Sequence, residues 1–81
     1  MSKTNSLKQA ATRDLKYFEE RMVSLLNASS EAWEEYEKAA AEDPHSREAY
    51  AAYGHWDWLV REQHRLSPWL RMAQAKVESL R

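Results

Sequence analysis

Cysteine is absent from this chain of 81 residues, which excludes disulfides, thiolate metal ligands and a cysteine nucleophile. A single domain of this length buries little surface and is marginally stable alone. Small domains without disulfides rely on a metal, on oligomerisation or on very regular helix packing. The lack of disulfide chemistry is compatible with the cytoplasm, where we expect the protein to be located.

Glycine and proline are scarce, with one glycine and two prolines. Alanine, glutamate, leucine, arginine and lysine are abundant, and this composition favours helix over sheet. No apolar run approaches the roughly 18 residues that span a bilayer. The first residues, MSKTNSLKQAATRD, contain no apolar core of a signal peptide. We therefore expect a soluble intracellular protein.

An excess of charge of one sign is also missing, since the net charge is −1. That balance gives no general attraction to nucleic acid or to anionic lipid. The distribution is uneven, however. Residues 1–16 carry four basic residues and one acidic, residues 61–81 carry five and two, and residues 31–60 carry two and eight. In a hairpin the open end is then basic and the turn end acidic, which favours two hairpins side by side in opposite directions.

The strongest break in the chain is the segment EDPHS at residues 42–46. Pro44 disfavours helical geometry at Asp43. The hydroxyl of Ser46 is suited to cap a new helix. This segment predicts a tight turn near the middle of the chain.

After the turn, apolar residues recur at alternating spacings of three and four. We call this row the second seam: Ala49, Ala52, Trp56, Leu59, Gln63, Leu66, Leu70, Ala73, Val77 and Leu80. Such spacing predicts the buried stripe of a coiled-coil helix over about residues 46–80. Pro68 falls on the outer side, where a kink is tolerated, so we expect one helix bent at Pro68. The alternative is a break at Ser67, with Pro68 starting a new helix.

Before the turn, the same spacing defines the first seam: Ala11, Leu15, Phe18, Met22, Leu25, Ser29, Ala32, Tyr36 and Ala39. It predicts helix over about residues 5–42, with residues 1–5 disordered. The side chain of Asn27, Ser29 or Ser30 is suited to cap a second helix within this half of the chain. The first half is therefore one helix, or two helices with a break near residues 28–30.

Two helices of similar length joined by a tight turn predict an all-α antiparallel hairpin. Folding at the turn places residues side by side when their numbers add to about 88. An isolated pair of helices has no enclosed core, so we expect a homodimer of hairpins forming a four-helix bundle. The alternative is a monomeric three-helix bundle, in which residues 30–42 fold back as the third helix.

Trp56 and Trp58 flank Asp57, and in a helix they point in nearly opposite directions. Trp56 belongs to the second seam. Trp58 instead joins Trp69 and Met72 in a second apolar stripe on the flank of the same helix. A two-helix hairpin cannot bury this stripe as well, so it predicts contact with another molecule.

No arrangement typical of catalysis or metal binding is found. His45, His55 and His64 lack the spacing of helical metal ligands. Adjacent glutamates do not face each other on a helix, and the single glycine rules out a phosphate-binding loop. We expect no enzyme activity, no metal and no cofactor.

Tryptophan, tyrosine, methionine and arginine are enriched in interfaces and favour binding of another protein, by a small regulator, adaptor or inhibitor. The candidate protein-binding residues are Trp58, Arg65, Trp69, Met72, Trp33, Tyr36, Glu34 and Glu37. The alternative is an RNA- or DNA-binding regulator that uses the basic open end of a dimeric hairpin. Its candidate residues are Lys8, Arg13, Lys16, Arg65, Arg71 and Lys76.

Overall fold

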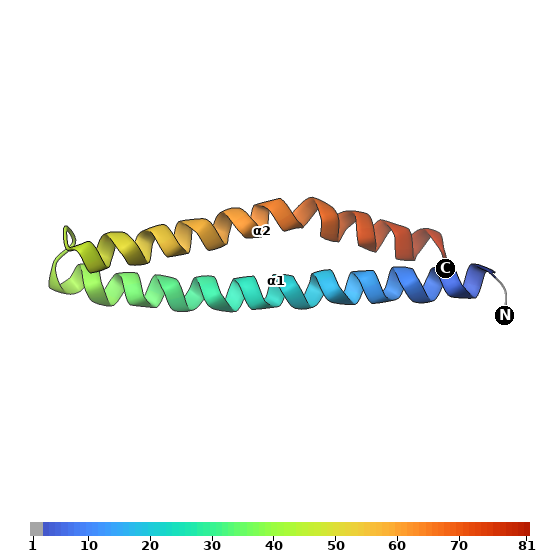
Figure 1. Cartoon of the computed structure of the whole chain (residues 1–81), viewed down its shortest axis with the longest axis horizontal. Coiled ribbons are helices and arrows are strands. Elements are labelled where there is room, and N and C mark those ends of the chain that lie inside the picture. Colours follow the sequence, from blue (N-terminus) through green and yellow to red (C-terminus); the bar gives the residue numbers. More distant parts are fainter. Residues whose placement is uncertain (1–2) are drawn as a thin grey trace.

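The computed structural model describes residues 3–81, which form two helices joined by a short turn (Figure 1). Helix α1 spans Lys3–Glu42 and helix α2 spans Arg47–Ser79. They pack antiparallel in a rod of 61 × 16 × 14 Å, without a strand among the described residues. The predicted all-α hairpin is confirmed. Of the five residues predicted to be disordered, residues 1 and 2 lie outside the described part, and α1 already begins at Lys3.

The turn lies where EDPHS predicts it. Ser46 has extended backbone angles, φ −72° and ψ 157°, and its Oγ accepts a hydrogen bond from the backbone N–H of Ala49 at 3.1 Å. The backbone N–H of His45 donates to Oδ1 of Asp43 at 2.9 Å. These side-chain bonds satisfy one backbone amide of the turn and one of the first turn of α2, and they stabilise the reversal of the chain.

Helix α1 is unbroken through residues 27–31, so the three-helix alternative is wrong for the described residues. The segment 30–42 continues α1 instead of folding back. Ser29 does not act as a cap, because its Oγ donates to the carbonyl of Leu26 within the helix, at 2.9 Å. This back-bonding is how a serine is accommodated inside a helix.

Pro68 lies inside α2, so the alternative break at Ser67 is also wrong. The proline is exposed, on the side of α2 that faces away from α1. Figure 1 shows α2 bowed away from α1 along its orange part, which contains this residue. A proline removes one backbone hydrogen bond, and on the outer side the carbonyl that loses its donor faces water.

Both seams are confirmed along their whole length. Every residue of the first seam and of the second seam is buried or half-buried. The positions that helical spacing places opposite the seams are all exposed: Arg13, Glu20, Asn27 and Glu34 in α1, and Gly54, Arg61, Pro68 and Ala75 in α2. Aromatic contacts Trp33–Trp56 and Tyr36–Tyr53 join residues whose numbers add to 89, which confirms the predicted register.

The core between the helices is thin. Six hydrophobic residues are buried among those that the structure describes, and four of them are alanines: Ala11, Leu25, Ala32, Ala49, Leu59 and Ala73. No large side chain is completely buried in the described part of the chain. Burying a leucine contributes about 2 kcal/mol and an alanine much less, so the hairpin alone is held together by a small apolar core.

A polar contact joins the two seams near their centre. Gln63 Nε2 donates to Ser29 Oγ at 2.9 Å and to the carbonyl oxygen of Leu25 at 3.2 Å. Ser29 and Gln63 are the single polar members of their seams. A paired polar residue inside a coiled coil fixes which residues lie opposite each other, so this contact sets the register of α1 against α2.

Candidate functional site

The exposed surface of the rod divides into two broad faces, one on each side of the seams. Helical spacing places the residues on them. The Trp58 face carries Trp58, Glu62, Arg65, Trp69 and Met72 of α2. The Trp33 face carries Trp33 and Glu37 of α1 and Tyr53 of α2. Both faces are hollowed between the helices, and the hollow beside Glu62 and Arg65 shares no lining residue with the one beside Trp33 and Glu37.

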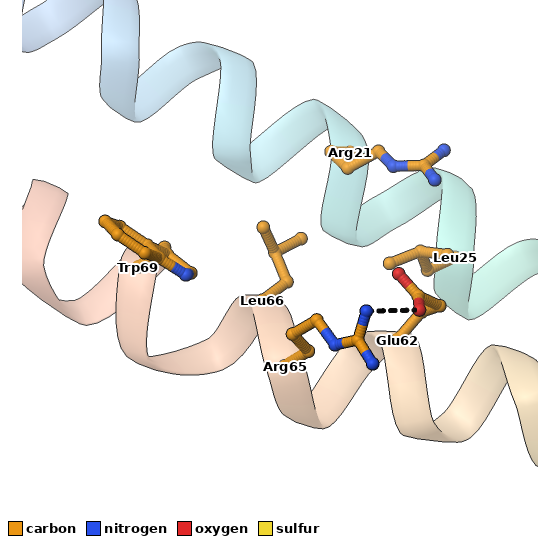
Figure 2. Close-up of a pocket in the computed structure, with 6 residues that line it drawn as sticks. All are labelled: Arg21, Leu25, Glu62, Arg65, Leu66 and Trp69. Atoms are coloured by element: carbon orange, nitrogen blue, oxygen red, sulfur yellow. Dashed lines mark ion pairs between the residues drawn. The ribbon is translucent and has the colours of Figure 1, made fainter.

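On the Trp58 face the predicted stripe of apolar side chains is exposed. Trp58 is 53% exposed, Trp69 56% and Met72 63%. Between the two tryptophans in the sequence, Arg65 Nη1 lies 3.4 Å from Glu62 Oε1, and Figure 2 shows Leu66 between this pair and Trp69. On this face one pair of opposite charges therefore lies between two large apolar side chains.

Two shallow hollows on the Trp58 face also involve α1. The first, of about 150 Å³, lies between Arg21 and Leu25 of α1 and the α2 residues drawn in Figure 2. The second, nearer the open end, is lined by Ala11, Asp14, Phe18, Trp69, Met72, Ala73 and Lys76. Trp69 thus lies over the boundary between the helices, where a partner would contact both of them.

On the Trp33 face four aromatic rings from both helices contact one another. We call Trp33, Tyr36, Tyr53 and Trp56 the aromatic cluster. Trp33 stacks on Tyr36 with ring centres 5.1 Å apart and nearly parallel planes, at 4°. Trp33 also contacts Trp56 at 5.0 Å, and Tyr53 contacts Tyr36 and Trp56, each at 5.6 Å. The cluster joins α1 to α2 near the turn and still leaves Trp33 38% exposed.

Carboxylates border the aromatic cluster. Glu34 and Glu37 line an open hollow together with Ser29, Ser30, Trp33 and Trp56. Both glutamates are exposed, and they belong to the acidic half of the rod. Four candidate residues of this region, Trp33, Glu34, Tyr36 and Glu37, are therefore brought together at the turn end. They lie apart from Trp58, Arg65, Trp69 and Met72, which are on the other face.

The candidate nucleic-acid-binding residues are not gathered on one face. By helical spacing Arg65 and Lys76 lie on the Trp58 face, Lys16 and Arg71 lie on the opposite flank, and Arg13 points outward from α1. Lys8 lines a hollow at the open end with Arg81. Lys16 and Arg65 each have an acidic partner, Glu20 at 3.9 Å and Glu62 at 3.4 Å. Nucleic-acid binding is favoured by a continuous basic stripe, which these residues do not form.

Three residues at these surfaces were not among the candidate site residues. Tyr53 and Trp56 complete the aromatic cluster, and Glu62 pairs with Arg65. The signal for Tyr53 and Trp56 was present in the predicted register, because both lie opposite Tyr36 or Trp33. Glu62 lies three residues before Arg65, which is the spacing of neighbours on a helix surface.

Comparisons of the chain with protein families, with curated proteins and with solved structures find no match. Residues 3–81 contain no helix that is both long and apolar enough to cross a membrane. Among the same residues, no group of three or more histidines and carboxylates is arranged to hold a metal ion.

Proposed function

We propose that this chain is a non-enzymatic binding protein: a small helical regulator, adaptor or inhibitor whose hairpins pair as a homodimeric four-helix bundle. In this proposal the Trp58 face holds the second copy. The Trp33 face, with its acidic rim, binds a basic segment of another protein.

One observation carries the proposal, namely the imbalance between buried and exposed apolar groups. In the part of the chain that the structure describes, six hydrophobic residues are buried and ten large ones are exposed, among them three of the four tryptophans. Large apolar side chains that share one exposed face, as Trp58, Trp69 and Met72 do, are typical of an interaction site. A chain this small also gains needed stability from association, since it has no disulfide.

Charge favours an antiparallel pair of rods. The open end of the hairpin is basic and the turn end acidic, because residues 31–60 carry eight acidic and two basic residues. In a parallel pair like ends would meet, and like charges in contact are unfavourable. An antiparallel pair brings each acidic end beside a basic end.

The Trp33 face suits a partner with arginine or lysine side chains. An arginine guanidinium stacks well on tryptophan and tyrosine rings. Trp33 presents such a ring, and Glu34 and Glu37 lie beside it. A cation that stacks on Trp33 therefore finds a carboxylate within the same hollow. Blocking the basic surface of a nucleic-acid-binding protein is one form that such an inhibitor would take.

The self-association is tested by the solution mass, measured by light scattering during size-exclusion chromatography. We expect a dimer for the wild type and a monomer for Trp58→Ala/Trp69→Ala. Circular dichroism checks that the variant stays helical. A wild type that remains monomeric at high micromolar concentration would contradict the homodimer.

The second partner is tested with a defined probe, a fluorescent arginine-rich peptide. We expect the peptide to bind and to quench tryptophan fluorescence, and Glu34→Gln/Glu37→Gln to weaken binding by about tenfold. The matched control is Glu19→Gln/Glu20→Gln, which removes the same charge outside the hollow. Equal binding by the two variants would contradict this site. Preferential binding of a single-stranded oligonucleotide would instead favour the nucleic-acid alternative.

A further inference from the structure

We propose that the Trp58 faces of two copies pair about a two-fold axis that crosses α2 between Gln63 and His64. In this pairing Trp58 of each copy lies against Trp69 of the other, and Glu62 lies against Arg65. This inference rests on the homodimer proposed above and adds its register and its specificity-determining residues.

The register follows from the order of side chains along α2. Trp58, Glu62, Arg65 and Trp69 are separated by four, three and four residues. The spacings are the same when the row is read from either end. A tryptophan then corresponds to a tryptophan, and the negative Glu62 corresponds to the positive Arg65. In a two-fold interface residue i contacts j, and j contacts i. A row of this kind is complementary to itself when the second copy runs in the opposite direction.

The four side chains share one stripe of the helix. Spacings of three and four residues bring side chains to the same side of a helix. Trp58 and Trp69 are exposed to a similar extent, 53% and 56%. The ring contacts found among residues 3–81 involve neither of them. Each tryptophan therefore has an open face for a ring of the second copy.

Helix α1 supports the same axis. Gln63 bonds to the carbonyl of Leu25, and cluster contacts join residues whose numbers add to 89. The axis therefore passes α1 near residue 26. Two pairs of opposite charge are equally spaced about residue 26 on the same flank of α1: Asp14 with Lys38, and Arg21 with Glu31. The two-fold operation brings each of these residues beside its opposite charge in the second copy.

The rod is large enough for this interface. Its broad side measures 61 by 16 Å, whereas a standard interface buries roughly 800 Å² on each partner. An axis between Gln63 and His64 lies at the middle of α2, so the two rods overlap along nearly their full length. In Figure 1, which looks down the shortest axis of the rod, the orange part of α2 bows sideways, away from α1.

A charge-swap experiment tests the pairing directly. We expect Glu62→Arg and Arg65→Glu, each alone, to raise the dimer dissociation constant at least about tenfold, because like charges then meet across the axis. An equimolar mixture of the two variants restores a dimer, since each copy supplies the charge that the other needs. The double variant Glu62→Arg/Arg65→Glu also dimerises, because swapping both charges preserves the complementarity. The matched controls are Glu20→Arg and Arg61→Glu, which change the same charges on outward positions.

The outcomes separate this inference from the proposed function. Each variant chain keeps its own substitution in the mixture. A dimer that forms only on mixing therefore reflects a contact between the two chains and not a change within one of them. Single variants that dimerise like the wild type, or a mixture that stays monomeric, would overturn this register while leaving a homodimer in place. A wild type without any dimer would overturn both. Sedimentation equilibrium on each variant and on the mixture gives the dissociation constants, and circular dichroism confirms that each variant is folded.

Discussion

The two broad faces of the rod use the same kind of residue in different ways. On the Trp33 face, the rings of the aromatic cluster contact one another across α1 and α2. On the Trp58 face, Trp58 and Trp69 are more than half exposed and stand apart. Aromatic content alone therefore does not identify the face that holds the second copy. What separates the two faces is whether the rings already have partners within the chain.

The difference also changes what each tryptophan contributes to stability. A ring packed between two helices stabilises the hairpin whether or not another molecule is bound. An exposed ring contributes little to the isolated hairpin and gains its partner contacts only on association. Substitutions of the tryptophans should accordingly affect different measurements, the stability of the hairpin for Trp56 and the formation of the dimer for Trp58 and Trp69.

The largest effect is expected from Trp56→Ala. Trp56 is half-buried, contacts Trp33 and Tyr53, and packs against the buried core. We expect its loss to lower the free energy of unfolding by about 3 kcal/mol, the lower end for truncating a tryptophan. Urea denaturation at one fixed protein concentration measures this, because a dimer unfolds at a concentration-dependent midpoint.

Trp58→Ala is the matched control, two residues away and on the other face. At concentrations low enough to dissociate a dimer, we expect a change within about 0.5 kcal/mol. A loss comparable to that of Trp56→Ala would break the comparison, because Trp58 would then be part of the fold of the hairpin.

A smaller effect tests the polar contact that lies between the two faces. We expect a double-mutant cycle of Ser29→Ala and Gln63→Ala to give a coupling energy of about 1 kcal/mol, the usual value for a protein hydrogen bond. Denaturation of the four proteins of the cycle gives this number. A coupling near zero would mean that the bond between Gln63 Nε2 and Ser29 Oγ contributes nothing to stability.

Spacing along the chain predicted most of this fold because the helix has one fixed period. Residues of the two seams had to share a side, and Pro44 with Ser46 had to interrupt the helix. The same period placed Trp58 off the seam and Trp56 on it. These predictions needed no knowledge of which side chains touch.

The spacing of residues within one helix could not predict features that depend on contacts between the two helices. The segment around Ser29 was compatible with a cap or with a continuous helix, and packing of Leu25 and Ala32 against Leu59 decided for the continuous helix. The contact of Ser29 with Gln63 depends on the register to within one turn. The aromatic cluster likewise requires the relative rotation of α1 and α2, which a single helix does not encode.

Gly54→Ala offers a change that should affect stability and neither face. Gly54 lies inside α2 on an outward position, and a Cβ added there has no atom within 4 Å. That distance excludes the two neighbouring residues and the backbone of the same helix, so no side chain or second helix opposes the added methyl group. We expect the free energy of unfolding to rise by about 0.8 kcal/mol, because alanine loses less backbone entropy in a helix. Thermal denaturation measures the gain, and sedimentation should show unchanged association. A destabilised variant would indicate that position 54 is covered by another molecule.

The smallest effects distinguish two similar ion pairs on α2. Arg61 pairs with Asp57 at 3.0 Å, away from the Trp58 face, and Arg65 pairs with Glu62 at 3.4 Å within it. Because both arginines are largely exposed, neutralising either acid should change hairpin stability by no more than about 0.5 kcal/mol. Of these two variants only Glu62→Gln should also weaken the dimer, since Glu62, unlike Asp57, meets a charge of the second copy. Sedimentation of Asp57→Asn beside Glu62→Gln therefore separates a pair that serves the helix from one that serves the interface. Equal dissociation constants for the two variants would mean that neither ion pair contributes to the interface.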